Sequence, residues 1–291
     1  MGLDIGSRSA KCVILQDGQL LTYGQVETGP DSARTASDAV DAAIHRRGEL
    51  WGEERESSPE GVRTDHLRVE DMDYIVSTGY GRAVVPFAHG TVTEISCHGR
   101  GAHRLVPGVS TILDMGGQDC KAIRVNERGE VTKFVMNDKC AGGTGRFLEI
   151  IADVLQVPLS EIGALSLTST KDISISRVCA VFARSEAVAL MRKGVSKPDI
   201  LAGLHEVIAT RVLGMLRSVG IEDQFVITGG IARNVGVVAR IGEKIGGVNV
   251  NIPAHPMIVG ALGAALFALD RARKRATRHE DSHAADQLGI A

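Results

Sequence analysis

Residues 113–125 read LDMGGQDCKAIRV, and residues 3–15 read LDIGSRSAKCVIL. Each stretch has an aspartate at the end of an apolar run, a glycine turn with small polar residues, and a lysine seven positions after the aspartate. We predict that each forms a β-turn-β hairpin that presents backbone N–H groups to phosphate oxygens while its aspartate faces a phosphate-bound Mg²⁺. One Asp-x-Gly turn would be weak evidence, but two copies in matching register indicate two similar halves.

A third glycine-rich element lies near the end of the chain. Residues 226–234 read VITGGIARN, which predicts a buried strand, a double-glycine turn and then a helix. Such a turn lets a planar nucleoside approach the backbone closely. The following VGALGAALFAL (residues 259–269) is rich in small residues, so we expect its helix to lie tightly against a sheet.

The composition restricts the possible partners. With 291 residues, of which 44% are hydrophobic, the chain is long enough for two domains with sizeable cores. Aromatic residues make up 3%, so the core must be aliphatic and no stacking platform for single-stranded nucleic acid is visible. The formal net charge is -2 and the charges are mixed, which argues against nucleic acid or an anionic membrane as a partner.

The cysteines and the N-terminus indicate the compartment. No apolar run approaches the roughly 20 residues that span a bilayer, and the first residues read as a strand rather than a secretory signal, so we expect a cytoplasmic protein. The odd, widely spaced set of five cysteines fits a reduced compartment better than a disulfide framework. These are Cys12, Cys97, Cys120, Cys140 and Cys179.

The pattern of apolar residues predicts an α/β fold in two domains. The predicted strands are three runs in the first 26 residues, then residues 73–78, 110–116, 121–126, 131–136, 224–230 and 248–252. The predicted helices are residues 32–47, 94–105, 146–155, 185–192, 198–218, 235–245 and 260–273. We place domain I at residues 1–92, with the helix 260–275 returning to it, domain II at 93–259, a polar surface insertion at 48–71 and a mobile tail at 276–291.

The order of these motifs resembles a known superfamily. Two Asp-Gly hairpins, a Gly-Gly loop and a small-residue terminal helix are similar to actin, the heat-shock ATPases and the sugar kinases. That resemblance implies duplicated mixed β-sheets flanked by helices, in two domains that close over ATP. It also implies which residues bind the nucleotide: Asp4, Asp114 and Gln118 for catalysis with Mg²⁺, Gly6, Ser7, Lys11, Gly116 and Gly117 for phosphate, and Gly229, Gly230 and Asn234 beside the nucleoside.

Five further motifs resemble one branch of that superfamily: STGYGR (77–82), TEISCHGRGA (93–102), DMGGQDCK (114–121), FVMNDKCAGGTGRFLE (134–149) and VCAVFARSEAVALM (178–191). The branch contains the ATP-dependent activators of 2-hydroxyacyl-CoA dehydratases and the ATPase subunits of benzoyl-CoA reductases. The resemblance implies one [4Fe-4S] cluster held between two subunits, with Cys140 and Cys179 as ligands. One departure is Arg184, which stands where relatives often carry an acidic residue.

The residues themselves fit a shared cluster. A cubane cluster usually takes four thiolates, and each chain offers two in polar, glycine-adjacent or helix-start settings, so two chains complete the set. We expect the N-termini of the two following helices to face the anionic cluster. Cys12, Cys97 and Cys120 are better explained as small buried hydrophobic residues. Zinc is the alternative metal, but no Cys-x₂-Cys pair is present.

Histidine gives no comparable signal. Of the nine histidines, only His279 and His283 have the spacing His-Glu-x-x-His, and they lie in the polar stretch 276–291 that we expect to be a mobile tail, so a catalytic metal held by histidine is improbable. We expect His98 and His103 to be packing or solvent residues.

These observations predict an ATPase coupled to electron transfer. Our first interpretation is a [4Fe-4S] subunit of a dearomatising benzoyl-CoA reductase, an oxidoreductase; the alternatives are a homodimeric activator of a 2-hydroxyacyl-CoA dehydratase and a small-molecule kinase of the same fold. A redox-silent ATPase acting as a binding module is a further rival. The expected partners are a paralogous subunit or a second copy across the cluster, acyl-CoA reductase or dehydratase subunits, and an electron donor such as ferredoxin or flavodoxin.

Overall fold

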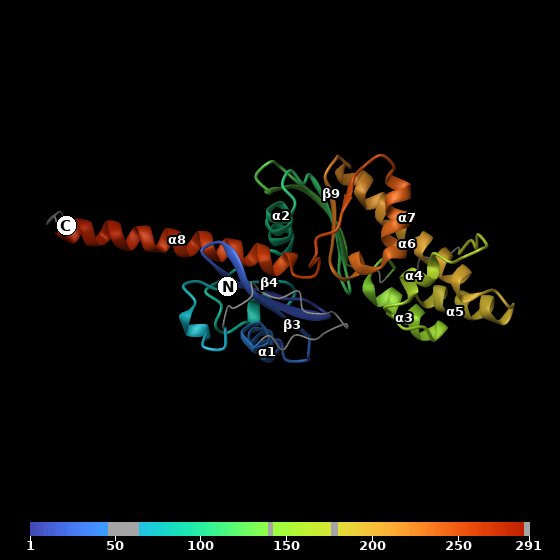
Figure 1. Cartoon of the computed structure of the whole chain (residues 1–291), viewed down its shortest axis with the longest axis horizontal. Coiled ribbons are helices and arrows are strands. Elements are labelled where there is room, and N and C mark those ends of the chain that lie inside the picture. Colours follow the sequence, from blue (N-terminus) through green and yellow to red (C-terminus); the bar gives the residue numbers. More distant parts are fainter. Residues whose placement is uncertain (46–63, 139–141, 176–179, 288–291) are drawn as a thin grey trace. The chain divides into compact units, whose positions relative to one another are not determined.

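The chain forms two compact units, each built on one five-stranded mixed sheet (Figure 1). The computed structural model describes residues 1–45, 64–138, 142–175 and 180–287. The first unit comprises Met1–Cys97 and Gly260–Ala291, and the second comprises His98–Val259. The predicted α/β class with duplicated mixed sheets flanked by helices is therefore confirmed.

The sheet of the first unit has the strand order β3-β2-β1-β4-β5. Its strands are β1 (Gly2–Ile5), β2 (Ser9–Gln16), β3 (Gln19–Glu27), β4 (Val76–Thr78) and β5 (Gly90–Thr91). The first three are antiparallel neighbours, and β4 runs parallel to β1. Helix α1 (Ser32–His45) packs its alanine-rich side against this sheet, with the predicted inward residues Ala36, Val40, Ala43 and Ile44 all buried.

The sheet of the second unit repeats this plan in the order β8-β7-β6-β9-β10. Its strands are β6 (Thr111–Met115), β7 (Cys120–Val125), β8 (Val131–Asn137), β9 (Phe225–Thr228) and β10 (Val250–Asn251). Its helices are α2 (Glu94–Leu105), which starts in the first unit, and α3 (Gly145–Leu155), α4 (Ile162–Ser166), α5 (Ala180–Arg192), α6 (Lys197–Val219) and α7 (Val235–Ile245). An aliphatic core joins the sheet to α3, α6 and α7.

The two sheets also share their strand register. Asp4 lies opposite Lys11 across β1 and β2, and Asp114 lies opposite Lys121 across β6 and β7. On the parallel side, Asp4 is in register with Thr78 of β4, just as Asp114 is with Thr228 of β9. The internal duplication predicted from the hairpins is thus present, and it extends to the neighbouring parallel strands.

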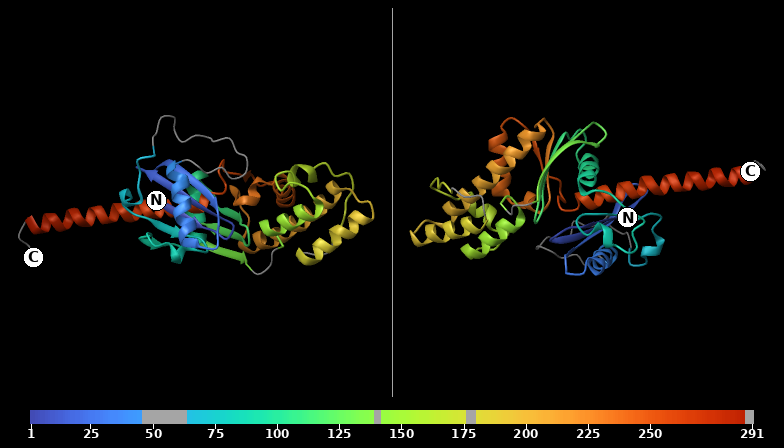
Figure 2. Two further views of the ribbon diagram at one scale, coloured as in Figure 1. Left: turned by 90° about the horizontal axis from the view of Figure 1, so that it is seen from below. Right: turned by 180° about the vertical axis from the view of Figure 1, so that it is seen from behind.

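Three short 3₁₀ helices, Val69–Asp71, Arg82–Val84 and Gly230–Arg233, complete the described secondary structure with α8 (Val259–Gln287). Helices α5 and α8 are longer than predicted. The start of α5 is rich in alanine, and residues 264–287 contain neither glycine nor proline, so nothing ends α8 after residue 273 (Figure 2). None of the described helices is both long and apolar enough to cross a membrane.

Helix α8 packs closely within the first unit, as its small residues predicted. A Cβ atom on Gly2 of β1 would overlap the backbone of Ala265, and one on Gly263 would overlap the carbonyl of Cys97 in α2. Backbone therefore touches backbone at both positions, because only glycine leaves the space.

Replacing Gly263 by alanine tests this packing. Although alanine is the better helix former, Gly263→Ala should destabilise the chain by about 1–3 kcal/mol, because the new methyl group overlaps rigid backbone. Gly214→Ala is the matched control: Gly214 lies inside α6 with nothing near its missing Cβ, so the change should be neutral or stabilising by up to about 1 kcal/mol. Urea denaturation measures both, and equal effects in the two variants would contradict the expectation.

Candidate nucleotide site

The first hairpin places a carboxylate and an ammonium group at the end of β1. Asp4 is buried, and its Oδ2 lies 3.8 Å from Nζ of Lys11, which also donates a hydrogen bond of 3.2 Å to the carbonyl of Ser9. Gly6 and Ser7 form the turn between the two strands. The predicted residues of this hairpin are therefore neighbours.

The second hairpin holds the same pair more tightly. Nζ of Lys121 lies 3.3 Å from Oδ2 of Asp114 and 2.8 Å from Oδ1 of Asp119, and only 1% of the lysine surface is exposed. The amide of Gly116 donates to the carbonyl of Asp119, which closes the turn that contains Gly117 and Gln118. The Lys121 ammonium thus lies between two carboxylates, and its charge favours the ionised form of Asp114.

A glycine that follows the neighbouring parallel strand packs directly against each aspartate, and its φ lies in the left-handed region. Gly79 follows β4 with φ of +84°, and its Cβ would lie 2.5 Å from Oδ1 of Asp4. Gly229 follows β9 with φ of +82°, and its Cβ would lie 2.9 Å from Oδ1 of Asp114. We predicted that Gly229 lies beside a nucleoside. The structure shows that it also packs against the carboxylate of Asp114.

Two side chains that the sequence motifs did not single out complete the surroundings of Asp114. The Thr228 hydroxyl donates to Oδ1 of Asp114 (3.2 Å) and lies 3.2 Å from Nδ1 of His98, whose Nε2 is 3.5 Å from Oδ2. Burial alone would raise the pKa of Asp114, but His98, Lys121 and Thr228 together lower it below the usual aspartate value. Asp114 therefore remains ionised, which suits it to orient a cation or a water molecule.

His98 could not have been identified from spacing. It lies on α2, sixteen residues before Asp114, and only the fold brings the two together. We expected His98 to be a packing or solvent residue. It is buried, but it also lies beside the carboxylate of Asp114, which we did not foresee. His103, five residues later on the same helix, packs against Gly129 and takes no part in this cluster.

The predicted nucleoside loop is held by a second buried polar cluster. Asn234 caps α7 by accepting from the amide of Val237, and its Oδ1 lies 3.0 Å from Nε2 of His205 on α6. The other ring nitrogen of His205 lies 2.7 Å from the carbonyl of Leu201. Burial lowers the pKa of His205 to about 4, with a further contribution from Arg240, so the ring is neutral at pH 7.

The three cysteines that the structure describes are buried, as we expected. Cys12, Cys97 and Cys120 are buried free thiols. Burial raises the pKa of Cys12 and of Cys97 to about 12 and raises that of Cys120 as well, so these thiols hold their protons. The predicted ligands Cys140 and Cys179 lie outside the described residues.

The N-terminus of α3 differs from our expectation. We expected its N–H groups to face a cluster bound at Cys140. The amides of Gly145 and Arg146 instead donate to the carbonyls of Gly116 and Gly117 in the second hairpin, and that of Phe147 donates to Thr144. The first two donors are used because the Gly116–Gly117 turn lies against the start of the helix, and the third because it closes the first turn of the helix itself.

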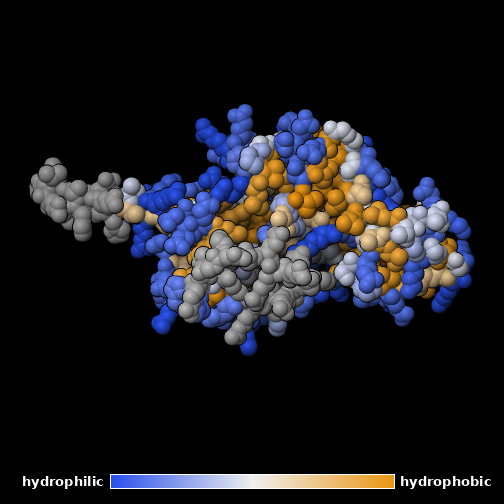
Figure 3. Space-filling model, in the orientation of Figure 1, coloured by the Kyte–Doolittle hydropathy of each residue, from blue (hydrophilic) through white to orange (hydrophobic). Residues whose placement is uncertain are grey.

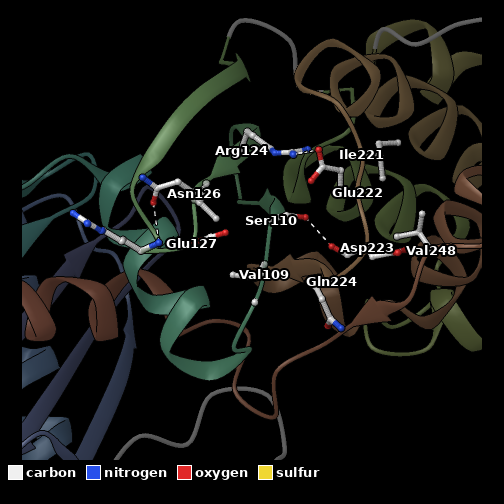
Figure 4. Close-up of a pocket in the computed structure, with 13 residues that line it drawn as sticks. Val109, Ser110, Arg124, Asn126, Glu127, Ile221, Glu222, Asp223, Gln224 and Val248 are labelled. Carbon is white, nitrogen blue, oxygen red and sulfur yellow. Dashed lines mark hydrogen bonds and ion pairs between the residues drawn. The ribbon is translucent and has the colours of Figure 1, made fainter.

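A pocket also opens at the opposite end of the second sheet's central strands. It has a volume of about 1060 Å³, and Ser110, Arg124, Glu222, Asp223 and Gln224 are among the residues that line it (Figure 4). These residues flank the start of β6 and β9 and the end of β7, whereas Asp114 stands near the end of β6. Asp114 lies four positions further along the chain than Ser110, about 13 Å of extended strand, so this pocket does not contain the predicted phosphate-binding residues.

Comparison with known proteins identifies close relatives. The sequence model of a family described as the BadF/BadG/BcrA/BcrD ATPase family matches residues 1–268. The (R)-2-hydroxyglutaryl-CoA dehydratase activating ATPase of Acidaminococcus fermentans is 41% identical over 283 residues, which cover 94% of this chain and 98% of that protein. One of the benzoyl-CoA reductase subunits of Thauera aromatica is 38% identical over 216 residues, covering 72% and 76%.

A solved structure agrees with these matches. The activator of the 2-hydroxyisocaproyl-CoA dehydratase from Clostridium difficile, determined with bound ADPNP, has a TM-score of 0.84 and 35% identity, covering 95% of this chain and 96% of that one. The resemblance drawn from the motifs is thereby confirmed, and so is the actin-like ATPase fold.

Removing the Thr228 hydroxyl should impair the chemical step. Thr228→Val deprives Asp114 and His98 of their shared partner, so we expect kcat for ATP hydrolysis to fall about tenfold with little change in the Kd for ADP. Thr228→Ser keeps the hydroxyl and should restore most of the rate. Steady-state kinetics and calorimetry give the two constants, and a Val variant as fast as the unmodified chain would contradict the assigned role.

His205 should make stability depend on pH. Its pKa is about 4 when folded, below the usual 6.5, so the unfolded chain binds the extra proton first and stability falls as pH drops from about 6.5 towards 4. Between pH 7.5 and 5 this residue should cost about 2 kcal/mol. His205→Gln should lose that part of the decline, as measured by urea unfolding at both pH values; identical pH profiles would show that the ring does not titrate in this way.

Proposed function

The chain belongs to the BadF/BadG/BcrA/BcrD ATPase family, and from this premise we propose that it is an ATP-hydrolysing activator of a 2-hydroxyacyl-CoA dehydratase. In this role two copies hold one [4Fe-4S] cluster and deliver electrons at low potential to the dehydratase. The proposal includes Mg·ATP as the ligand of the two hairpins and ferredoxin or flavodoxin as the electron donor.

The observation that carries the proposal is the extent of the match. The activating ATPase of Acidaminococcus fermentans aligns over 98% of its own length, whereas the benzoyl-CoA reductase protein of Thauera aromatica aligns over 76% of its length. From the motifs alone we placed the reductase function first and the activator second. The comparisons favour the opposite order, so the reductase function becomes the alternative.

The chain's own groups support ATP hydrolysis. Asp114 stays ionised beside Lys121 and His98, so it would orient Mg²⁺ or the attacking water and would be a poor proton acceptor. Asp4 would do the same from the first hairpin. The turn residues Gly116, Gly117 and Gln118 would donate backbone N–H groups to phosphate oxygens, with Gln118 also placed to orient water. These roles remain predictions.

The described surroundings are compatible with a cluster at Cys140 and Cys179. When bound, such a cluster would supply one-electron transfer at low potential. The other three cysteines are buried as thiols and are poor ligands. Helix α5 begins directly after Cys179, and the edge strand β8 ends three residues before Cys140.

The edge strand β8 supports a second copy of the chain as the partner. It exposes Phe134 and Met136, half and two-fifths of whose surface is accessible, close in sequence to Cys140. Figure 3 shows that apolar residues reach the surface over a broad area of the face drawn there. Exposed apolar side chains on an edge strand are typical of a surface that another copy or another protein covers.

A small-molecule kinase remains the rival from another class. It requires a substrate pocket with a general base, and the two described hairpins contain no acidic group that is free of a lysine for this purpose: Asp4 and Asp114 are both paired. A redox-silent ATPase is the second rival, and it would retain its whole activity without Cys140.

Iron analysis of protein purified without oxygen tests the proposal. We expect about four iron atoms for each pair of chains, because two thiolates come from each copy. Cys140→Ser and Cys179→Ser should each lose the iron and the electron paramagnetic resonance signal of the reduced cluster, whereas Cys12→Ala, which alters a buried thiol, should keep both. Colourless, iron-free native protein would refute the proposal.

The assembly distinguishes the two family alternatives. An activator should be isolated as a dimer of this chain and should activate a separately purified dehydratase when given ATP and a reductant. Stoichiometric companion subunits, with reduction of an aromatic acyl-CoA, would instead support the reductase alternative.

A further inference from the structure

The pocket at the start of β6 and β9 has no part in the proposed function. It has a volume of about 1060 Å³ and lies within the second unit, between the loop before β6, the β7–β8 turn and the loop from α6 to β9 (Figure 4). Its apolar lining residues are Val109, Val125, Ile221 and Val248. Val109 and Val125 are buried, so this apolar surface is a fixed part of the fold. A pocket with an apolar surface and a few polar groups is typical of a small-molecule site.

One wall of the pocket carries an ion pair between Arg124 of β7 and Glu222 (Figure 4). The hydrogen bond from Arg124, together with its charge, lowers the pKa of Glu222, so the partner of the guanidinium is an ionised carboxylate. The two side chains differ in exposure, because 20% of the Arg124 side-chain surface is accessible against 62% for Glu222. The guanidinium is therefore part of the wall, whereas most of the Glu222 side chain stands in water.

Backbone contacts hold this wall in place without the Glu222 carboxylate. Nη1 of Arg124 donates to the carbonyl of Gly220 at 3.5 Å, and the Thr111 hydroxyl donates to the same carbonyl at 3.3 Å. The amide of Glu222 donates to the Thr111 hydroxyl at 3.4 Å. The Glu222 side chain can therefore turn into solvent while the loop and the guanidinium stay in place. The cost is small, because an ion pair with an exposed partner contributes little to stability.

The charges around the pocket restrict the kind of ligand. A guanidinium group is suited to bind a carboxylate, and Glu222 supplies one from the chain itself. Arg128, Glu127 and Asp223 also line the pocket, so its carboxylates outnumber its guanidinium groups. This excess disfavours a ligand with several negative charges. A ligand with one carboxylate on an apolar chain fits both the guanidinium and the apolar surface.

A strained residue lies on the side of the pocket away from Arg124 (Figure 4). Gln224 has a φ of +64°, in the left-handed region that glycine and asparagine adopt more readily. Its carbonyl accepts from the amide of Ser110 at 3.3 Å, which joins two walls of the pocket. Glycine would adopt this conformation without strain, and strained residues cluster at sites that bind ligands. The strain is thus a second observation, independent of the ion pair, that indicates a binding site.

We propose that this pocket binds a small organic acid with one carboxylate and an apolar chain, and that the carboxylate of the acid replaces that of Glu222 on Arg124. Glu222 thus takes the position of the ligand in the free protein and turns into solvent when the acid binds. This inference goes beyond the proposed function and does not depend on it, because the pocket contains none of the predicted nucleotide or cluster residues.

Hexanoate binding to the full chain, measured by ligand-observed NMR in the presence of Mg·ADP, tests the site. Glu222→Gln removes the competing carboxylate and should bind hexanoate about tenfold more tightly than the unmodified chain, whereas Arg124→Gln should bind it about tenfold more weakly. A gain of affinity in Glu222→Gln also shows that this variant is folded.

Glu206→Gln is the matched control. Glu206 also forms an ion pair with an exposed carboxylate, in this case with Lys244, but it does not line the pocket. Its replacement should therefore leave the affinity for hexanoate unchanged.

Related ligands test the assigned chemistry. Hexanamide lacks the charge and acetate lacks the apolar chain, so each should bind the unmodified chain about tenfold more weakly than hexanoate. Hexylammonium carries the opposite charge and should not compete with hexanoate.

The outcomes separate this inference from the proposed function. Equal hexanoate affinity in the unmodified chain, Glu222→Gln and Arg124→Gln would overturn the assignment, and so would tighter binding of hexylammonium than of hexanoate. Iron-free native protein would refute the activator proposal and would leave this site unaffected.

Discussion

The buried pair of aspartate and lysine across each hairpin is the constraint on which the site depends. An aspartate at the end of an apolar strand would lose hydration without compensation, and the lysine in register with it supplies the missing charge. The pair in turn requires the neighbouring parallel strand to end in a glycine with positive φ, because any side chain there would collide with the carboxylate. Strand order, register and the two glycines are therefore consequences of placing a charged carboxylate at that position.

The two hairpins share this geometry, but their aspartates have different surroundings. Around Asp4 the structure places Lys11 and the loop after β4, whereas around Asp114 it adds His98, Asp119 and the Thr228 hydroxyl. Each hydrogen bond removes a direction in which a carboxylate could turn, so these contacts fix the orientation of Asp114. In the function proposed above, that orientation would serve to hold a water molecule or a cation.

Much of this arrangement could be predicted from local sequence, and the part that could not depends on long-range contacts. The hairpins, their register and the boundaries of α2 follow from turn residues and from alternating apolar positions, which are short-range signals. His98, Thr228 and His205 carry no such signal, because each acquires its role from a partner that is distant in the sequence. The hydrogen bonds from α3 to the turn could not be predicted either. They join backbone atoms, which are the same in every residue type, so the sequence carries no signal for them. The assignment of Cys140 and Cys179 as cluster ligands rests on the family resemblance, because both lie outside the described residues.

Helix α6 fixes the spacing between two segments that lead towards the predicted cluster ligands. Asp199 at its start accepts from the amides of Thr170 and Lys171, in the segment that precedes Cys179, and Arg211 holds Asn137, before Cys140. Twelve residues of one helix, about 18 Å, fix the distance between these two anchors. A rigid helix cannot change that spacing, so the two anchors stay a fixed distance apart. The start of α3 is held from another direction, because the backbone of the Gly116–Gly117 turn makes direct contact with it.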